Sequence, residues 1–430
     1  MFDLPTDTIH RLLKALDASK GLSTDTREDL EDQVFFALRG ANFDGNAFVP
    51  VALDQGAAHA VTTDSKWVGH PKVTVVANEL GALQCLAQAY RRRWTCPVLG
   101  MTGSNGKTTT KELIRDVLRE AMDVHATKGN LNNHIGVPLT LLNAPAQPDF
   151  VVVEMGANHQ GEIDLLSRIA EPTHGYITNI GLAHLEGFGG EEGVYRGKKE
   201  LFDHLAVHGG TAFVQEADPK VVRASQGVEK CVAVPTPSWT WTPKPEGGGV
   251  AAFHGAAISM ELEGSYNLGN VAAAVAIGAH FGVSWEQAQR ALSAYVPTNH
   301  RSQTVVTNDN WVLLDAYNAN PSSMTHAVND FAKRGHAGAL AILGDMAELG
   351  NASEEAHRHL AHSVREQGLT LWTVGSWFGE VHRASQLKDW RHFDSFEALV
   401  EWLQKEPLSD THVLVKGSRS AGLERLLPYL

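Results

Sequence analysis

The feature that most constrains the fold is a glycine-rich loop at residues 102–109, TGSNGKTT. It follows the apolar run PVLGM and precedes TTTKELIRDVLRE, in which Leu113, Ile114, Val117 and Leu118 share one helical face. A strand, a loop of small residues and a helix in this order form a phosphate-binding loop, because backbone N–H groups can surround phosphate oxygens at a positively polarised helix N-terminus. The motif therefore predicts ATP binding within a doubly wound α/β sheet.

Individual positions of this loop have expected roles. Lys107 is expected to contact the β- and γ-phosphates, and the hydroxyl of Thr108 to bind Mg²⁺. Met101 stands where the strict Walker pattern has glycine. The residues expected to bind the nucleotide here are Thr102, Gly103, Ser104, Asn105, Gly106, Lys107, Thr108 and Thr109.

The 430 residues divide into three predicted α/β domains, 1–93, 94–297 and 298–430. Short β-rich runs in the first occur at 34–38, 59–62 and 73–77. In the third, runs at 311–315, 339–343, 371–374 and 412–415 alternate with helical patterns near 323–334, 353–367 and 396–404. This alternation predicts a second open, mostly parallel sheet. The proline- and glycine-rich stretch 235–249 is expected to be irregular, and Arg91, Arg92 and Arg93 to form a solvated helix end.

Composition excludes several classes of function. A formal net charge of −13 leaves no overall basic footprint for nucleic acid. The three cysteines lack CxxC spacing, which argues against a disulfide framework or a structural zinc site. The N-terminus does not resemble a signal peptide, and there is no run of 18 apolar residues. We therefore expect a soluble, cytoplasmic protein with no membrane span.

Two residues at the ends of predicted strands, and a lysine of the helical stretch that follows them, also attract attention in the central block. Glu154 ends the run FVVVE, His184 lies just beyond the run at 176–180, and Lys198 is fourteen residues further along. Considered singly, each has an ordinary explanation as an exposed or packed side chain. The carboxylate of Glu154 is a kind of ligand that Mg²⁺ prefers, and only the spacing of the three residues taken as a whole points beyond these ordinary explanations.

Considered together, these motifs resemble those of the Mur ligase family, ATP-dependent amide-forming ligases of peptidoglycan precursor synthesis, over essentially the whole chain. TGSNGKTTT is similar to the family's phosphate loop, which also departs from the Walker form, and EMGANHQGEI and TNIGLAHLEGFGG are similar to its metal-ligand segments. The resemblance implies two Mg²⁺ ions and a lysine carbamylated by CO₂, which matches Lys198, with its neighbour Lys199 as the competing candidate. The implied metal ligands are Thr108, Glu154, His184 and Lys198, and the implied catalytic residues are Lys107, Lys198, His184 and Glu154.

Other segments extend the resemblance. SYNLGNVAAAVA, HRSQ and LLDAYNANPSSM imply nucleotide contacts by Asn267, Asn270, Arg301 and Asp315. Asn299 and His300 stand before Arg301 where the family more often has Pro-Gly. The N-terminal block resembles a UDP-binding domain, which implies substrate contacts by Thr26, Arg27, Ala41, Asn42 and Phe43. Asn130, Asn132 and Asn133 are expected to line the acceptor cleft, and Lys416, Ser418 and Arg419 to hold a carboxylate or acyl phosphate.

LLDAYNANPSSM and LGDMAELG are most similar to signatures of the branch that adds D-alanyl-D-alanine. The resemblance implies a monomeric ligase that joins UDP-N-acetylmuramoyl-tripeptide to D-alanyl-D-alanine through an acyl phosphate. A diaminopimelate-adding enzyme, whose DNPR segment is absent, and folylpolyglutamate synthase are the alternatives within ligases. A P-loop kinase and an inactive nucleotide-binding module are the alternatives in other classes. The sequence leaves the third residue of the tripeptide open.

Overall fold

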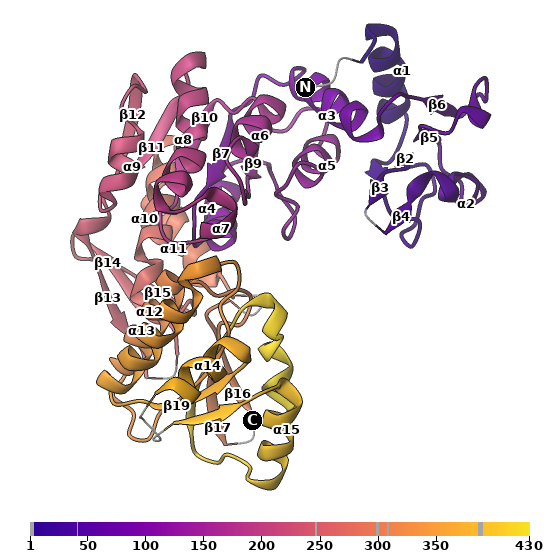
Figure 1. Cartoon of the computed structure of the whole chain (residues 1–430). Coiled ribbons are helices and arrows are strands. Elements are labelled where there is room, and N and C mark those ends of the chain that lie inside the picture. Colours follow the sequence, from indigo (N-terminus) through magenta and orange to yellow (C-terminus); the bar gives the residue numbers. More distant parts are fainter. Residues whose placement is uncertain (1–3, 41, 246, 298–300, 308, 386–389) are drawn as a thin grey trace.

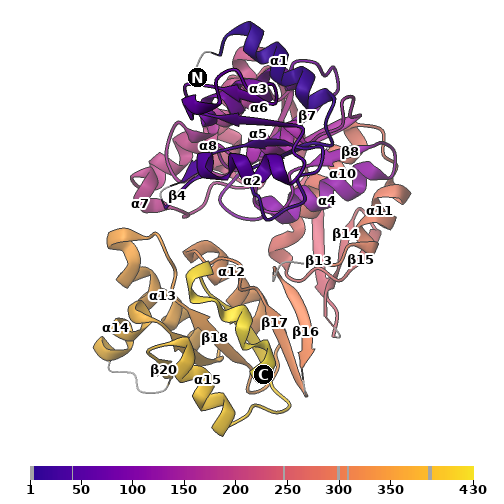
Figure 2. The same ribbon diagram turned by 90° about the vertical axis from the view of Figure 1, so that its right-hand side faces the viewer.

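The computed structural model describes residues 4–40, 42–245, 247–297, 301–307, 309–385 and 390–430. Three sheets of parallel or mostly parallel strands follow one another along the chain, with helices beside each, and this confirms the predicted α/β fold class. We call the parts within 1–93, 94–297 and 298–430 the N-terminal, central and third units. The N-terminal and third units adjoin different sides of the central unit (Figures 1 and 2).

The N-terminal unit has a four-stranded parallel sheet in the order β1-β2-β5-β6. Its strands are β1 (Leu22–Ser23), β2 (Val34–Phe36), β5 (His59–Thr62) and β6 (Val73–Val75), beside a small hairpin of β3 (Arg39–Gly40) and β4 (Phe43–Asp44). The helices are α1 (Thr6–Asp17), α2 (Val49–Asp54) and α3 (Glu79–Arg91). The side chain of Asn78 caps α3 by accepting a hydrogen bond from the Gly81 N–H at 2.6 Å.

The central unit has six parallel strands in the order β12-β11-β10-β7-β9-β8. They are β7 (Val98–Thr102), β8 (Val124–Ala126), β9 (Phe150–Glu154), β10 (His174–Ile177), β11 (Thr211–Gln215) and β12 (Lys230–Val234). The helices are α4 (Lys107–Arg119), α5 (Gly136–Leu142), α6 (Glu162–Ala170), α7 (Leu185–Phe188), α8 (Glu191–His208), α9 (Pro219–Ala224), α10 (Leu268–His280) and α11 (Trp285–Ala294). Strand order reverses at β7, so the loops after β7, β9 and β10 meet where α/β sheets bind ligands.

Helix α3 joins the first two units. It packs against both α5 and α6 of the central unit. Leu83 and Leu86 of α3 belong to the same hydrophobic cluster as Leu12 of α1 and Val137 of α5. The N-terminal and central units therefore share one continuous apolar core.

The expectation of an irregular stretch at 235–249 is wrong. An antiparallel sheet of β13 (Trp239–Pro243), β14 (Gly249–Phe253) and β15 (Ala256–Met260) begins there. Trp239 stacks on Phe253 with ring centroids 5.0 Å apart and joins the cluster that contains α10. The alternation in WTWT is a strand signal, and burial of Trp239 stabilises the strand despite the flanking prolines.

The third unit has a six-stranded sheet in the order β16-β17-β21-β18-β19-β20, in which only β16 is antiparallel to its neighbour. The strands are β16 (Gln303–Thr307), β17 (Asn310–Leu314), β18 (Leu340–Gly344), β19 (Thr370–Val374), β20 (Arg391–Phe393) and β21 (His412–Lys416). The helices are α12 (Pro321–Ala332), α13 (Ser353–Glu366), α14 (Ser376–Ala384) and α15 (Phe396–Lys405). The sequence did not predict β16, β20 or α14, and both strands are edge strands with few buried residues.

Arg91 also differs from expectation, because it is buried rather than solvated. Its guanidinium donates to the carbonyls of Ala170 at 2.9 Å, Glu171 at 2.9 Å and Trp94 at 3.2 Å. The arginine thus ties the end of α3 to the end of α6. None of the helices in the described part of the chain combines the length and the apolar character that crossing a membrane requires.

Candidate active site

A cleft of about 960 Å³ lies at the carboxyl edge of the central sheet, and residues of the third unit form its other wall. The phosphate loop, the ends of β9 and β10 and the start of α10 contribute to it. The predicted site residues that line it are Ser104, Asn105, Gly106, Lys107, Thr108, Thr109, Asn130, Asn132, Asn133, Glu154, His184, Asn267, Asn270, Arg301, Asp315 and Lys416. Residues far apart in the sequence therefore meet in one cavity.

The phosphate loop is held in shape by its own contacts. Gly106 has a φ of 76°, and a Cβ there would lie 2.8 Å from Asn270 Oδ1, so a glycine is required. The Asn105 N–H donates to Asn179 Oδ1 at 3.0 Å. Lys107 Nζ donates to the Gly103 carbonyl at 2.7 Å, so its ammonium lies over the loop that would receive phosphates.

Glu154, at the end of β9, is bound from three directions. Its Oε1 accepts hydrogen bonds from Thr108 Oγ1 at 3.2 Å and from Asn132 Nδ2 at 2.8 Å. Lys111 Nζ lies 3.3 Å from Oε2, and within the described part of the chain that oxygen accepts no hydrogen bond. Sequence reasoning missed Lys111, although its spacing of four residues from Lys107 places both on one side of α4.

The two neighbouring lysines of α8 have different surroundings. Lys198 is buried, donates only weakly to the Ala157 carbonyl at 3.4 Å, and lies 5.0 Å from the centre of the Phe188 ring. Burial, with repulsion from Lys107, holds the pKa of Lys198 well below its usual value. Lys199 instead pairs with Asp203 one helical turn away. Lys198 is thus the lysine directed toward the cleft wall, because Ala157 lines the cleft.

His184 connects the central and third units. Its Nδ1 is hydrogen-bonded to Glu348 of the third unit, and both residues have left-handed backbone conformations, with φ of 53° and 62°. Burial lowers the pKa of His184, and the nearby Lys107 and Lys198 lower it further, whereas Glu348 opposes this shift. A neutral imidazole with one nitrogen engaged can offer the other to a ligand.

The other end of the cleft contains the predicted nucleotide contacts. Asn270 Nδ2 donates to Asn267 Oδ1 at 2.7 Å, and Asn270 Oδ1 accepts from Thr110 Oγ1 at 2.8 Å. The guanidinium of Arg301 lies 3.5 Å from the centre of the Tyr317 ring, and its buried Nε has no hydrogen-bond partner among the residues that the structure describes. Arg301 therefore keeps donor capacity for an anion.

Asp315 and Lys416, predicted for different substrates, bind one another, with Lys416 Nζ 2.5 Å from Asp315 Oδ2. Two residues that sequence reasoning did not select also join the units. Asn320 Nδ2 donates to Asn105 Oδ1 in the phosphate loop at 2.6 Å, and Glu348 binds His184. Asn320 lies in the segment YNANP and Glu348 in MAELG. Both segments stand out in the sequence by their resemblance to the family, but the sequence alone could not tell which of their residues make contacts.

Several predicted residues do not line the cleft. Thr102 and Gly103 lie at the base of the phosphate loop, and Lys198 lies behind the wall. Ser418 is buried and Arg419 exposed beside the cleft, with the Arg419 guanidinium 5.6 Å from the Tyr317 ring centre. Thr26, Arg27, Asn42 and Phe43 lie in the N-terminal unit, apart from the cleft lining. Ala41, Asn299 and His300 lie outside the described residues.

The side chains near Glu154 could bind a hard cation only by combining ligands of different residue types. Within the described ranges, no three His, Cys, Asp or Glu side chains gather as a ready-made metal site. Glu154 Oε1 nevertheless lies at the cleft, 3.2 Å from the hydroxyl oxygen of Thr108. Oxygen donors of this kind fit Mg²⁺, and an anionic derivative of Lys198 would complete the set.

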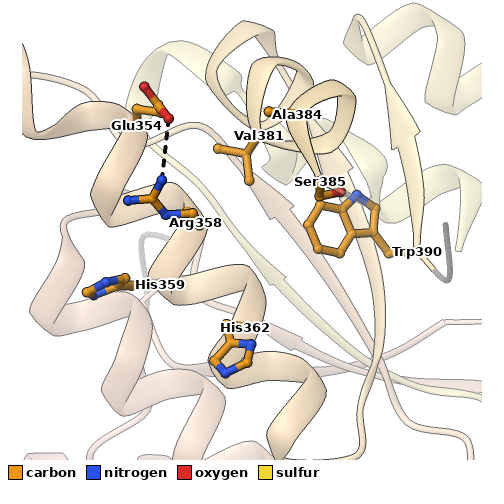
Figure 3. Close-up of a pocket in the computed structure, with 8 residues that line it drawn as sticks. All are labelled: Glu354, Arg358, His359, His362, Val381, Ala384, Ser385 and Trp390. Carbon is orange, nitrogen blue, oxygen red and sulfur yellow. Dashed lines mark ion pairs between the residues drawn. The ribbon is translucent and has the colours of Figure 1, made fainter. Parts of the chain in front are cut away.

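A second cavity, of about 410 Å³, lies between α13 and α14 of the third unit (Figure 3). Its wall includes Val381 and Trp390, and an ion pair of 3.5 Å joins Glu354 to Arg358 at its edge. None of the predicted site residues lines it. It is therefore separate from the cleft at the phosphate loop.

The fold and the cleft define a class: a P-loop nucleotide-binding protein whose third α/β unit forms a wall of the phosphate site. The family model described as Mur ligase middle domain matches residues 101–278, and that described as Mur ligase, glutamate ligase domain matches residues 300–419. The chain belongs to the Mur ligase family, as its sequence motifs predicted.

Named relatives agree with this membership. The UDP-N-acetylmuramoyl-tripeptide–D-alanyl-D-alanine ligase of Bacillus subtilis is 34% identical over 422 residues, which cover 95% of this chain and 92% of that protein. The crystal structure of MurF from Acinetobacter baumannii superposes with a TM-score of 0.84 at 28% identity, covering 97% of each chain. MurF ligase from Thermotoga maritima in complex with ADP superposes with a TM-score of 0.82 at 25% identity, covering 96% of this chain and 97% of that one.

Proposed function

We propose that the chain is an ATP-dependent ligase that joins UDP-N-acetylmuramoyl-tripeptide to D-alanyl-D-alanine. The names of its relatives support this substrate pair over diaminopimelate or glutamate addition. The observation that carries the proposal is the meeting of the phosphate loop, Glu154, His184 and residues of the third unit in one cleft. The ADP-bound relative supports ATP as the nucleotide.

The proposed reaction has two steps. A carboxylate oxygen of the tripeptide attacks the γ-phosphorus, the bond from that phosphorus to the bridging oxygen breaks, and ADP leaves with the bonding pair. The amine of D-alanyl-D-alanine then attacks the carbonyl carbon of the acyl phosphate and loses a proton, and inorganic phosphate leaves. Lys107 and Arg301 stabilise phosphate charge, and the contacts of the third unit with the phosphate loop help to exclude water.

Lys198 has the environment that carbamylation requires. Because burial disfavours its cationic form, the neutral amine is available to attack CO₂, forming an N–C bond and losing one proton. The resulting carbamate is an anion beside Ala157. Thr108, Glu154, His184 and this carbamate would hold Mg²⁺, which when bound would offset repulsion between the substrate carboxylate and ATP.

The remaining roles follow from the sequence motifs. We assign the uridine end of the substrate to residues 1–93, ATP to 94–297 and the incoming dipeptide to 298–430. Thr26, Arg27, Asn42 and Phe43 would contact the uridine diphosphate, Asn130 and Asn133 the acceptor, and Asn267, Asn270 and Asp315 the nucleotide. Lys416, Ser418 and Arg419 would hold the dipeptide carboxylate or the acyl phosphate. A cytoplasmic location and a monomeric state are part of the same proposal, as the family resemblance implies.

The deciding experiment is phosphate release from ATP and Mg²⁺ with UDP-N-acetylmuramoyl-tripeptide, with and without D-alanyl-D-alanine, followed by mass analysis. We expect release that requires both substrates and a pentapeptide product, with lysine- and diaminopimelate-containing tripeptides compared side by side. Release with diaminopimelate or glutamate as the amine would identify another ligase. A phosphorylated product without an amide would identify a kinase, and nucleotide binding without turnover would identify an inactive module.

A further inference from the structure

Lys111 is a buried cation for which the proposed reaction has no role. Its side chain is among the largest that are fully buried in the described part of the chain. Lys111 Nζ donates to the Gly129 carbonyl at 3.1 Å and lies 3.3 Å from Glu154 Oε2. Burying an ammonium ion costs free energy, so the position of this lysine calls for an explanation.

The position of Lys111 differs from that of the other Glu154 partners. Thr108, Asn132 and Glu154 line the cleft, whereas Lys111 does not. Lys111 therefore approaches the carboxylate from the protein interior, on the Oε2 side, while Thr108 and Asn132 bind Oε1 at the cleft. The Glu154 N–H is also fixed, because it donates to Thr127 Oγ1 at 3.0 Å. Both ends of this glutamate are thus anchored.

We propose that Lys111 is a positioning residue that holds the Glu154 carboxylate in the orientation that presents Oε1, beside the Thr108 hydroxyl, to a divalent cation at the phosphate loop. This inference rests on the metal role of Glu154 in the proposed function. Groups that orient a ligand from behind change metal affinity by about 10- to 100-fold when removed. A purely structural ion pair would change only the stability of the fold.

The test is Mn²⁺ binding to the full chain in the presence of ADP and without peptide substrates, measured by electron paramagnetic resonance. We expect Lys111→Met to weaken Mn²⁺ binding by about 10- to 100-fold. Lys111→Arg keeps the charge, but its planar fork cannot reproduce both contacts, so we expect a loss of about 3- to 10-fold. Lys128→Met removes a nearby exposed charge and serves as the matched control with unchanged binding.

Thermal unfolding of each variant identifies any that fails to fold. Lys111→Arg then decides the question if Lys111→Met is unfolded. Mn²⁺ affinity within twofold of the unmodified protein in the folded Lys111 variants would overturn the proposal. Glu154→Gln separates the metal role of Glu154 from the positioning role of Lys111. If Glu154→Gln loses Mn²⁺ binding while the Lys111 variants keep it, only the role of Lys111 fails. If the unmodified protein has no ADP-dependent Mn²⁺ site, both the metal role and this inference fail.

Discussion

At the scale of single residues, Lys198 and Lys199 are adjacent in the chain but chemically unlike. Lys198 is buried against Phe188, and Lys199 is paired with Asp203. We expect Lys198→Ala to lower turnover at least about 100-fold, because the proposed carbamate ligand could not form. Acetate or formate, added to the assay, should restore part of the rate by supplying a carboxylate in the vacated space.

Lys199→Ala is the matched control, and its turnover should stay within about threefold of that of the unmodified protein, as is usual for an exposed ion pair. Steady-state phosphate release measures both variants. Full activity of Lys198→Ala, or equal losses in the two variants, would contradict a metal role for Lys198.

Histidine burial gives a second prediction at this scale. Burial lowers the pKa of His59 in β5 to about 4, and its Nε2 lies 2.8 Å from Thr74 Oγ1. As the pH falls from about 6.5 to about 4, the unfolded chain binds a proton that the folded chain does not, so the free energy of unfolding falls. The contribution of this one side chain approaches about 3 kcal/mol at the acidic end.

Urea unfolding of His59→Gln at pH 7.5 and pH 5 tests this contribution. The loss of stability between the two values should be smaller in His59→Gln than in the unmodified protein, since glutamine does not titrate. His10→Gln, at an exposed position of α1, should leave the difference unchanged. An identical pH dependence in His59→Gln would contradict the prediction.

For individual residues, the sequence is informative where the signal is local. The phosphate loop could be recognised because its chemistry lies within eight consecutive residues between a strand and a helix. Lys111 and Glu348 were missed because their partners, Glu154 and His184, are distant in the sequence. Pairing of this kind depends on sheet order and on the docking of units, which a single sequence does not specify.

At the scale of elements, the end of α3 depends on Arg91. Arg91→Met removes the donor from two buried carbonyls and one partly buried carbonyl, and we expect it to lower the free energy of unfolding by about 2–4 kcal/mol. Arg93→Met, which breaks a more exposed pair with Asp17, should cost less than about 1 kcal/mol. Urea denaturation compares the two, and equal losses would show that Arg91 does not anchor α3 to α6.

The elements also show where periodicity fails as a guide. Strands β17, β18, β19 and β21 were predicted to within about two residues because each is a short apolar run. The edge strands β16 and β20 were not, since an edge strand needs few buried residues. Strand β13 was missed because prolines and glycines flank it, although Trp239 buries its face.

At the scale of the whole molecule, polar contacts attach the third unit to the central one, together with Leu185 of α7, which packs against an apolar cluster of the third unit. The apolar side chains of the third unit form two clusters of their own. Arg334 at the end of α12 pairs with the buried Glu263 and donates to the Lys244 carbonyl at 3.1 Å. Arg334→Met would leave Glu263 without its cation and should weaken docking by about 3 kcal/mol.

Small-angle X-ray scattering measures this effect as a larger radius of gyration, and calorimetry as a separate, earlier unfolding transition. Lys333→Met, at the neighbouring exposed position, provides the control and should change neither value. An unchanged radius of gyration in Arg334→Met would show that Arg334 does not hold the units together.

The core shared by the N-terminal and central units has a different consequence. Because Leu83 of α3 and Val137 of α5 pack in one cluster, these units cannot change their separation without opening an apolar interior. The span from the proposed uridine site to the phosphate loop is therefore fixed. If the uridine end binds where we propose, a peptide one residue too short would leave its terminal carboxylate out of reach of ATP, and the fold would select substrates by their length.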